Sequence, residues 1–241
     1  MDYNSFSDLQ RRYPRTLGND YTLPADLRQR FEAGVMTASA DDQALFLFER
    51  RVGFTKLHFR LLDTAAELVR TDGETLAAFL TYRLSRYPEI AAAWLLGQGF
   101  CKTNTLRRHT ASAITGDLST EGVSRATPDE AYTMLGRYFS PVEADMPCRE
   151  LYEGALCIRV EGTPVAMLYM GQTLIIAVAP EVRGQGLGKK LYRAYAAFKA
   201  SEGKKSVFHE WVRPDNAASL AMFASLGFTA DDVYTECYVR D

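Results

Sequence analysis

The most constraining part of this 241-residue chain lies late in the sequence, over residues 173–200. It begins with the uncharged apolar run Thr173-Leu-Ile-Ile-Ala-Val178, which predicts a buried strand. Next come Ala179-Pro-Glu-Val-Arg-Gly-Gln-Gly-Leu-Gly188 and an amphipathic stretch from Lys189 to Ala200, which predicts a helix. A strand that turns through glycines into a helix favours a pyrophosphate, because the free N–H groups and the positive dipole end of the helix attract anions.

The spacing of the glycines narrows the kind of phosphate loop. Gly184, Gly186 and Gly188 allow backbone conformations that are closed to residues with a Cβ, and they let a ligand approach. No Gly-Lys-Ser/Thr follows, so the segment is not a Walker loop. Its pattern, Arg-x-x-Gly-x-Gly, also differs from the dinucleotide fingerprint Gly-x-Gly-x-x-Gly. By itself, a Gly-x-Gly turn is equally compatible with a plain strand-to-helix connection.

A second block follows at residues 206–228. The strand-like run Ser206–Val212 leads into Arg213-Pro-Asp-Asn-Ala-Ala-Ser219, a short predicted helix, and Gly227-Phe228. In this order the two blocks resemble the GNAT superfamily of N-acetyltransferases. The acetyl-CoA loop of that family, Arg/Gln-x-x-Gly-x-Gly/Ala, is matched by Arg183, Gly186 and Gly188. The family's next block is Asn-x-x-Ala/Ser, a short helix and Gly-Phe. The resemblance covers about residues 118–241.

The resemblance implies a mixed-sheet α/β (α+β) fold, GNAT-like in the C-terminal half. We therefore expect a domain over residues 118–241 that binds acetyl-CoA, and an N-terminal α+β domain over residues 1–117 without a CoA loop. The hairpin expected at 44–62 and the segment Ala91–Phe100, which echoes Ser219–Phe228, suggest that the first half is a degenerate GNAT-like repeat. An unrelated α+β lobe is the alternative.

Further elements are expected from local patterns. In the first half these are a loop and helix over Tyr21–Val35 with Pro24 in the first turn, a helix over 88–96, an apolar run of undecided type over 74–86, and an edge strand over 100–109. In the second half they are a helix that starts at Thr127-Pro128, a hairpin around Glu161–Pro164, a helix over 217–225 and a last strand over 233–239.

Composition limits the partners of the protein. Hydrophobic residues make up 47% and charged residues 24% of the chain, the balance of a soluble globular protein. A net charge of −2 gives no reason to expect nucleic acid, an anionic membrane or a strongly basic acceptor. The four cysteines are scattered and the first residues do not look like a signal peptide, so we expect a cytoplasmic protein with reduced thiols. The three scattered histidines argue against a metal site.

The resemblance also assigns residues to acetyl-CoA, the co-substrate. The pyrophosphate would be held by the loop and the first turn of the helix, that is by Arg183, Gly184, Gln185, Gly186, Leu187, Gly188 and Lys189. The pantetheine amides would pair with the strand edge at Ile176, Ala177 and Val178, and the Val178 N–H would polarise the thioester carbonyl. Asn216, Ser219 and Phe223 would complete the cofactor contacts. The alternatives are a solvated surface role for Arg183 and a helix N-cap role for Asn216.

Proton transfer is where the chain departs from the family. The family's tyrosine, which protonates the departing thiolate, is replaced by Phe223. The candidates for another acid are Tyr192, Tyr234 and Tyr238, each of which is also compatible with ordinary packing. For the base, His209 and Glu210 are the candidates, and strand alternation places them on opposite faces. Trp211 shares the face of His209 and is a candidate wall of the acceptor pocket.

Two functions from different classes are compatible with these features. The first is an acyl-CoA-dependent N-acyltransferase in which a small-molecule or peptide amine attacks the thioester directly. No cysteine lies beside the loop, which argues against an acyl-enzyme. The second is a non-catalytic acyl-CoA-binding sensor, which Phe223 favours. In either case we expect a monomer or homodimer without a nucleic-acid or membrane partner.

Overall fold

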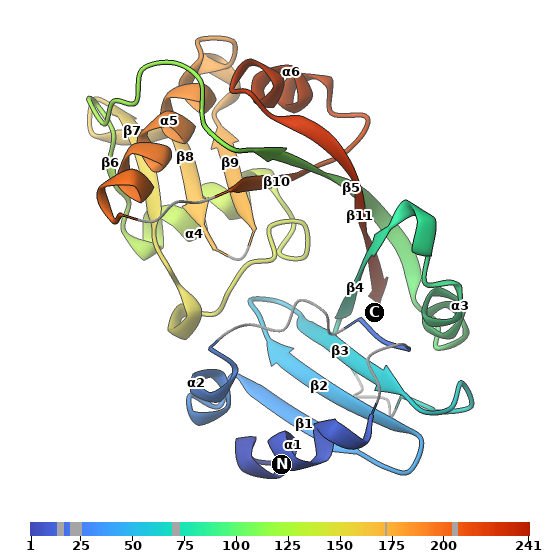
Figure 1. Ribbon diagram of the computed structural model, residues 1–241. Helices are drawn as coiled ribbons and strands as arrows, with labels where there is room; N and C mark the ends of the chain where they lie inside the picture. The colour runs from blue at the N-terminus through green and yellow to red at the C-terminus, as the bar shows by residue number, and fades with distance from the viewer. Residues whose placement is uncertain (14–16, 20–25, 69–72, 172, 204–206) are drawn as a thin grey trace. The chain divides into compact units, whose positions relative to one another are not determined.

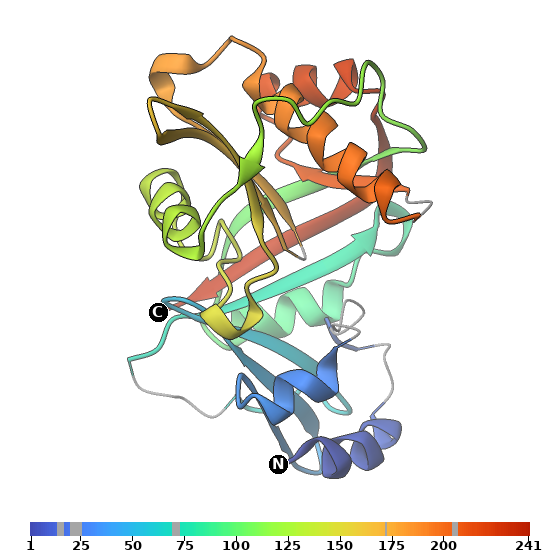
Figure 2. The same cartoon turned by 90° about the vertical axis from the view of Figure 1, so that its left-hand side faces the viewer.

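The computed structural model describes residues 1–13, 17–19, 26–68, 73–171, 173–203 and 207–241 (Figures 1 and 2). These residues form two compact units, each assembled from separate stretches of the chain. Unit 1 comprises Met1–Leu106, Met146–Glu150 and Asp232–Asp241, and unit 2 comprises Arg107–Asp145 and Leu151–Asp231. The division into domains between residues 117 and 118 stays a prediction. That position lies inside unit 2, in the loop after strand β5.

Unit 1 is built on a sheet of order β1-β2-β3-β4-β11-β5. The predicted hairpin is confirmed, because β2 and β3 pair antiparallel from Ala44 opposite Leu61 to Arg50 opposite Thr55. The run of undecided type is a strand, β4, parallel to β3. The helices and strands are α1 (Tyr3–Leu9), η1 (Gln10–Arg12), α2 (Leu27–Glu32), β1 (Met36–Ala40), β2 (Ala44–Arg50), β3 (Thr55–Leu61), β4 (Leu76–Arg83), η3 (Leu84–Arg86), α3 (Glu89–Gly97) and β5 (Cys101–Ala111).

The core of unit 1 lies on both faces of this sheet. On one face Trp94 of α3 packs against Phe46 and Phe59, with ring centroids 5.9 and 4.6 Å away. On the other, Phe6 of α1 packs over Leu45 and Leu47. The helix predicted over 88–96 is confirmed, whereas the one predicted toward Val35 is limited to α2. The Pro24 turn lies outside the described residues.

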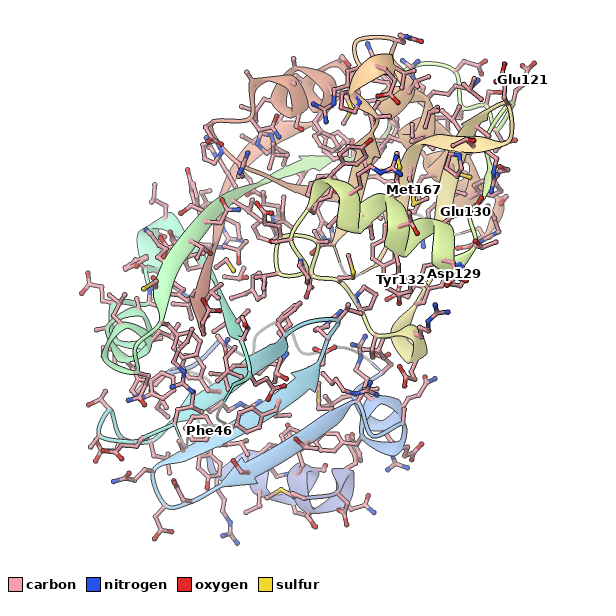
Figure 3. All side chains as sticks on the ribbon, turned by 180° about the vertical axis from the view of Figure 1, so that it is seen from behind. Phe46, Glu121, Asp129, Glu130, Tyr132 and Met167 are labelled. Atoms are coloured by element: carbon pink, nitrogen blue, oxygen red, sulfur yellow. The ribbon has the colours of Figure 1, made fainter. Side chains whose placement is uncertain are left out.

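Unit 2 contains a sheet of order β6-β7-β8-β9, with α4 on one face, over Met167 of β8, and α5 on the other (Figure 3). The predicted hairpin is confirmed, with Glu161 and Gly162 at φ 49° and 81° in its turn. In chain order, the elements that follow β5 are β6 (Ser124–Arg125), α4 (Pro128–Tyr138), η4 (Arg149–Leu151), β7 (Ala155–Val160), β8 (Thr163–Met170), β9 (Leu174–Val178), η5 (Pro180–Val182), α5 (Leu187–Ser201), β10 (Phe208–Val212), α6 (Ala217–Ser225) and β11 (Thr229–Arg240), of which most of η4 and β11 lies in unit 1.

The two halves of the sequence exchange strands. Most of β11 pairs with β4 in unit 1, from Val233 opposite Arg83 to Arg240 opposite Leu76. The end of β5 pairs with β10 in unit 2, from Arg107 opposite Val212 to Ala111 opposite Phe208. The prediction of β5 as an edge strand is therefore wrong, because β5 has β11 on one side and β10 on the other.

The junctions that lead into these two strands match. After α3, the Phe100 N–H donates to the Leu95 carbonyl, and Gly99 has φ 84°. After α6, the Phe228 N–H donates to the Phe223 carbonyl, and Gly227 has φ 94°. Both are helix ends of the Schellman type, which need a residue in the left-handed region. A degenerate repeat predicts this local match.

Within the described residues, no helix is long and apolar enough to cross a membrane.

Candidate functional site

The candidate site begins at the outer edge of β9 in unit 2, the last strand of its sheet. The Ala179 N–H donates to the Val165 carbonyl at 2.9 Å, so alternation directs the backbone of Ile176 and Val178 away from β8. Consistent with this, the Val178 carbonyl accepts a hydrogen bond from Arg183 Nε at 3.1 Å. The same alternation directs the backbone of Ala177 toward β8, so the open edge is presented by two of the three predicted residues.

The glycine loop connects this edge to α5. Gly184 and Gly186 have φ 79° and 77°, a region that favours glycine. Gly186 is the N-cap of α5, and no side chain caps this end of the helix. A Cβ on either glycine would meet nothing within 4 Å, so the space in front of the loop is open. The first N–H groups of α5 have no partner within the helix, and the loop therefore fits a pyrophosphate.

The remaining loop residues have mixed surroundings. Gly188 is buried, and a Cβ there would lie 2.8 Å from Met222 Sδ and 3.6 Å from Ile176 Cγ2. It therefore allows α5 to approach β9 and α6 closely. Gln185 is exposed, Leu187 packs on the core of unit 2, and Lys189 is half-buried. The exposed Arg183 guanidinium group lies 6.0 Å from the Tyr138 ring, so the group that donates to the Val178 carbonyl also lies over an aromatic ring.

The second sequence block forms the start of α6. The Asn216 side chain accepts a hydrogen bond from the Ser219 N–H at 3.1 Å, which is the N-cap expected as an alternative. Phe223, one turn further on, is only 7% exposed. Its ring makes edge contacts with Tyr192 and Phe228, at centroid distances of 5.6 and 5.1 Å. The place of the family's tyrosine is therefore inside an aromatic cluster.

The three tyrosines proposed as alternative acids are in different surroundings. Tyr192 lies in unit 2 on α5, and its hydroxyl donates to Glu210 Oε1 at 2.5 Å. Tyr234 and Tyr238 lie in unit 1. Tyr238 donates to Glu236 Oε2 at 2.7 Å, and Tyr234 stacks on Tyr82 with centroids 6.0 Å apart. Only Tyr192 of the three shares a unit with the glycine loop.

Glu210 is the most perturbed carboxyl group of this unit. It is 3% exposed on β10, and burial raises its pKa to about 8, although the hydrogen bond from Tyr192 opposes that rise. Burial and the neighbouring Glu210 carboxyl also raise the pKa of Tyr192, so this phenol keeps its proton. His209 is exposed, as the predicted alternation requires. Directly opposite Glu210 on β5 is His109, whose pKa burial lowers.

A cavity of about 170 Å³ lies between β9, α5 and β10. It is lined by Gly171, Thr173, Leu174, Tyr192, Tyr195, Val207, Phe208, His209, Glu210 and Trp211. It therefore brings together both candidate bases and Trp211. Sequence reasoning missed Tyr195 and His109. The spacing of Tyr195 from Tyr192 on a helix indicates a shared face, whereas the position of His109 follows from the β5–β10 pairing, which has no local signal.

Among the described residues, no group of three His, Cys, Asp or Glu side chains is arranged to hold a metal ion. The site itself offers a loop open to an anion, an outward-facing strand edge and a buried carboxyl group beside a hydroxyl. A thioester with a pyrophosphate-bearing arm matches the first two features.

Comparison with known proteins is consistent with this geometry. Residues 128–228 match the model of the acetyltransferase (GNAT) family. A mycothiol acetyltransferase from Renibacterium salmoninarum is 30% identical over 80 residues, which cover 32% of this chain and 23% of that relative. This chain therefore matches less than a quarter of that relative's length.

Solved structures show the same fold. A GCN5-related N-acetyltransferase from Kribbella flavida superposes with a TM-score of 0.55 at 16% identity, over 86% of this chain and 90% of that one. A tandem GNAT protein from the clavulanic acid biosynthesis pathway gives a TM-score of 0.52 at 14% identity, over 92% and 90%. The predicted fold class, a mixed-sheet α/β fold of the GNAT type, is confirmed.

Proposed function

Because this chain belongs to the GNAT acetyltransferase family through residues 128–228, we propose that it transfers an acetyl group from acetyl-CoA to an amine by direct attack. The observation that carries this proposal is one continuous segment, residues 174–190. It joins an outward-facing strand edge, a glycine loop open to an anion and an uncapped helix N-terminus. The acceptor is a small-molecule or peptide amine.

The donor would lie along this segment. The pyrophosphate would lie against Gly184, Gly186 and the first turn of α5, where N–H groups and the helix dipole favour negative charge. The pantetheine is placed along the edge at Ile176 and Val178, whose backbone groups point away from β8. Acetyl-CoA supplies the activated acyl group, and the chain supplies its position.

The chemical step needs a polarised carbonyl and a place for one proton. The amine nitrogen attacks the thioester carbonyl, a C–N bond forms, and the C–S bond breaks to release CoA as thiolate. The Val178 N–H would stabilise the oxyanion, a donor of the kind whose loss costs about 3 kcal/mol in the transition state. The proton of the attacking amine would go to the ionised form of Glu210, a residue that lines the cavity. With a pKa of about 8 this form is the minor one at pH 7, and a positively charged acceptor beside the carboxyl group would increase its share.

The departure of the thiolate is not assisted from position 223. Phe223 has no hydroxyl, and Tyr192, which touches its ring, already donates to Glu210. A thiol of pKa about 8.5 leaves acceptably as thiolate at neutral pH, so the reaction does not require this acid. The absence of a hydroxyl group at position 223 also favours a second function, an acyl-CoA-binding sensor that performs no transfer.

Gly186→Asp tests the placement of the donor. It sets a side chain and a negative charge in the open space before the loop, so we expect CoA binding, measured by calorimetry, to be lost. Gly203→Asp is the matched control, because Gly203 has φ 70°, has nothing within 4 Å of a Cβ, and lies just beyond the other end of α5, a helix about 22 Å long. Equal loss in both variants, or unchanged affinity in Gly186→Asp, would refute the placement.

Transfer is tested with the unmodified protein. Acetyl-CoA is incubated with a panel of amines, and release of CoA thiol is followed together with the acetylated product. Turnover with any amine supports the transferase. CoA binding without any transfer or hydrolysis supports the sensor.

A further inference from the structure

The cavity between β9, α5 and β10, here called the Glu210 cavity, has the features of a binding site for one small molecule. Its volume of about 170 Å³ is close to that of an engineered cavity of about 150 Å³ that holds benzene. The residues that line it include Tyr192, Tyr195 and Phe208. It therefore has room for a body of about the size of one aromatic ring.

The polar groups of the Glu210 cavity favour a ligand that carries a positive charge. Glu210 is the one acidic residue among the described residues that line it, and it is 3% exposed. The Tyr192 hydroxyl occupies its Oε1 at 2.5 Å, which fixes the orientation of the carboxyl group. A buried carboxyl group gains most from a partner that brings a positive charge and N–H donors, because such a partner compensates for its lost solvation.

The Glu210 cavity also lies along the edge that we assign to the donor. Leu174 lines it and belongs to the same outward-facing alternation of β9 as Ile176 and Val178. At about 3.3 Å per residue, Leu174 is about 7 Å from Ile176 along the strand. A molecule in the cavity is therefore next to the proposed path of the pantetheine.

We propose that the Glu210 cavity binds the ammonium group of a compact monoamine with one apolar ring or short apolar chain, and that it selects the acceptor in this way. This inference rests on the proposed acetyl transfer for its biological role. The single carboxyl group and the small volume disfavour polyamines and peptide segments, which bring further charges or more bulk than the cavity accepts.

Benzylamine is the probe, and benzyl alcohol is its uncharged analogue. Because burial raises the pKa of Glu210 to about 8, its carboxyl group is mostly protonated at pH 7, so an ammonium ion that holds it ionised should release most of one proton per molecule bound. Calorimetry at pH 7 in two buffers with different ionisation enthalpies measures this number. The other titratable groups on the side of Glu210 are Tyr192 and Tyr195 on α5 and His109 on β5, whereas His209, its neighbour on β10, lies on the opposite face of the strand. The proton release should persist in His109→Asn.

Glu210→Gln should abolish the proton release and weaken benzylamine binding at least tenfold, and benzyl alcohol should bind at least tenfold more weakly than benzylamine to the unmodified protein. Glu236→Gln, which alters a buried carboxyl group in unit 1, is the control and should change neither result. Equal binding to Glu210→Gln, equal binding of benzyl alcohol, tighter binding of spermidine, or no proton release would overturn the inference.

The two proposals fail separately. Benzylamine binding with proton release in a protein that acetylates no amine would leave the cavity assignment standing and remove the transferase. Acetyl transfer to amines by a protein that does not bind benzylamine through Glu210 would leave the transferase standing and remove the cavity assignment.

Discussion

Replacing Glu210 by Gln should change how the stability of the protein depends on pH. Burial raises the pKa of this carboxyl group from an ordinary 4.5 to about 8. Between these values the folded protein keeps a proton that the unfolded chain releases, so stability falls as pH rises. At 1.36 kcal/mol per pKa unit, the loss attributable to Glu210 between pH 5 and pH 8 is about 3–4 kcal/mol. That is a large share of the roughly 5–15 kcal/mol that stabilises a typical domain.

The assay is urea unfolding of the unmodified protein and of Glu210→Gln at pH 5, 6, 7 and 8. Gln cannot titrate, so the stability of the unmodified protein relative to the variant should fall by about 3–4 kcal/mol over this range, while other titrating groups cancel. Glu236→Gln is the control. The pKa of Glu236 is lowered by hydrogen bonds from Tyr238, Lys102 and Tyr87, although burial opposes this, so its contribution is lost only at lower pH. The difference in stability between the unmodified protein and Glu236→Gln should therefore stay constant from pH 5 to pH 8. If the stability difference between the unmodified protein and Glu210→Gln also stays constant from pH 5 to pH 8, Glu210 is not a buried neutral carboxyl group, and its assignment as the base is wrong.

Substitutions at three further positions test the packing of unit 2 and the chemistry at position 223. Gly188→Ala places a Cβ 2.8 Å from Sδ of the flexible Met222 side chain, which can shift, so it should cost about 1 kcal/mol or less in urea unfolding, and less again when combined with Met222→Ala. Phe223→Ala should cost about 3–5 kcal/mol, because the ring is buried against Tyr192 and Phe228, whereas Phe223→Tyr should keep kcat level or raise it in the transfer assay. Thr127→Ala removes the capping box at the start of α4 and should cost about 1 kcal/mol in thermal or urea unfolding.

Elements with a local cause were predictable from the sequence. Thr127 and Glu130 cap each other across the first turn of α4, and Asn216 caps α6, so each helix start is determined within four residues. The turn at Glu161-Gly162 is equally local, because a two-residue hairpin with positive φ at both positions favours glycine. The glycine loop belongs to the same class, which is why its position before α5 could be assigned from spacing.

The partners of β5 and β11 could not be predicted in this way. Both strands leave a helix through the same glycine–phenylalanine junction, at Gly99-Phe100 and Gly227-Phe228. Because the two junctions are alike, they give no local signal that tells the two pairings apart. The actual pairing is decided by contacts between residues more than 95 positions apart, such as Phe208 with Ala111. The edge prediction for β5 failed for this reason.

The proton chemistry of the site has the same long-range origin. The sequence places Glu210 on one face of a strand and Tyr192 on a helix, but their hydrogen bond depends on how α5 packs over β10. That packing also sets Phe223 against the Tyr192 ring, so the residue that replaces the family's tyrosine contacts the phenol that orients Glu210. The loss of a hydroxyl at position 223 and the presence of a buried carboxyl–phenol pair are therefore features of one aromatic cluster. A change at Phe223 should act on Glu210 through Tyr192, and the pH dependence of transfer is where that coupling is measurable.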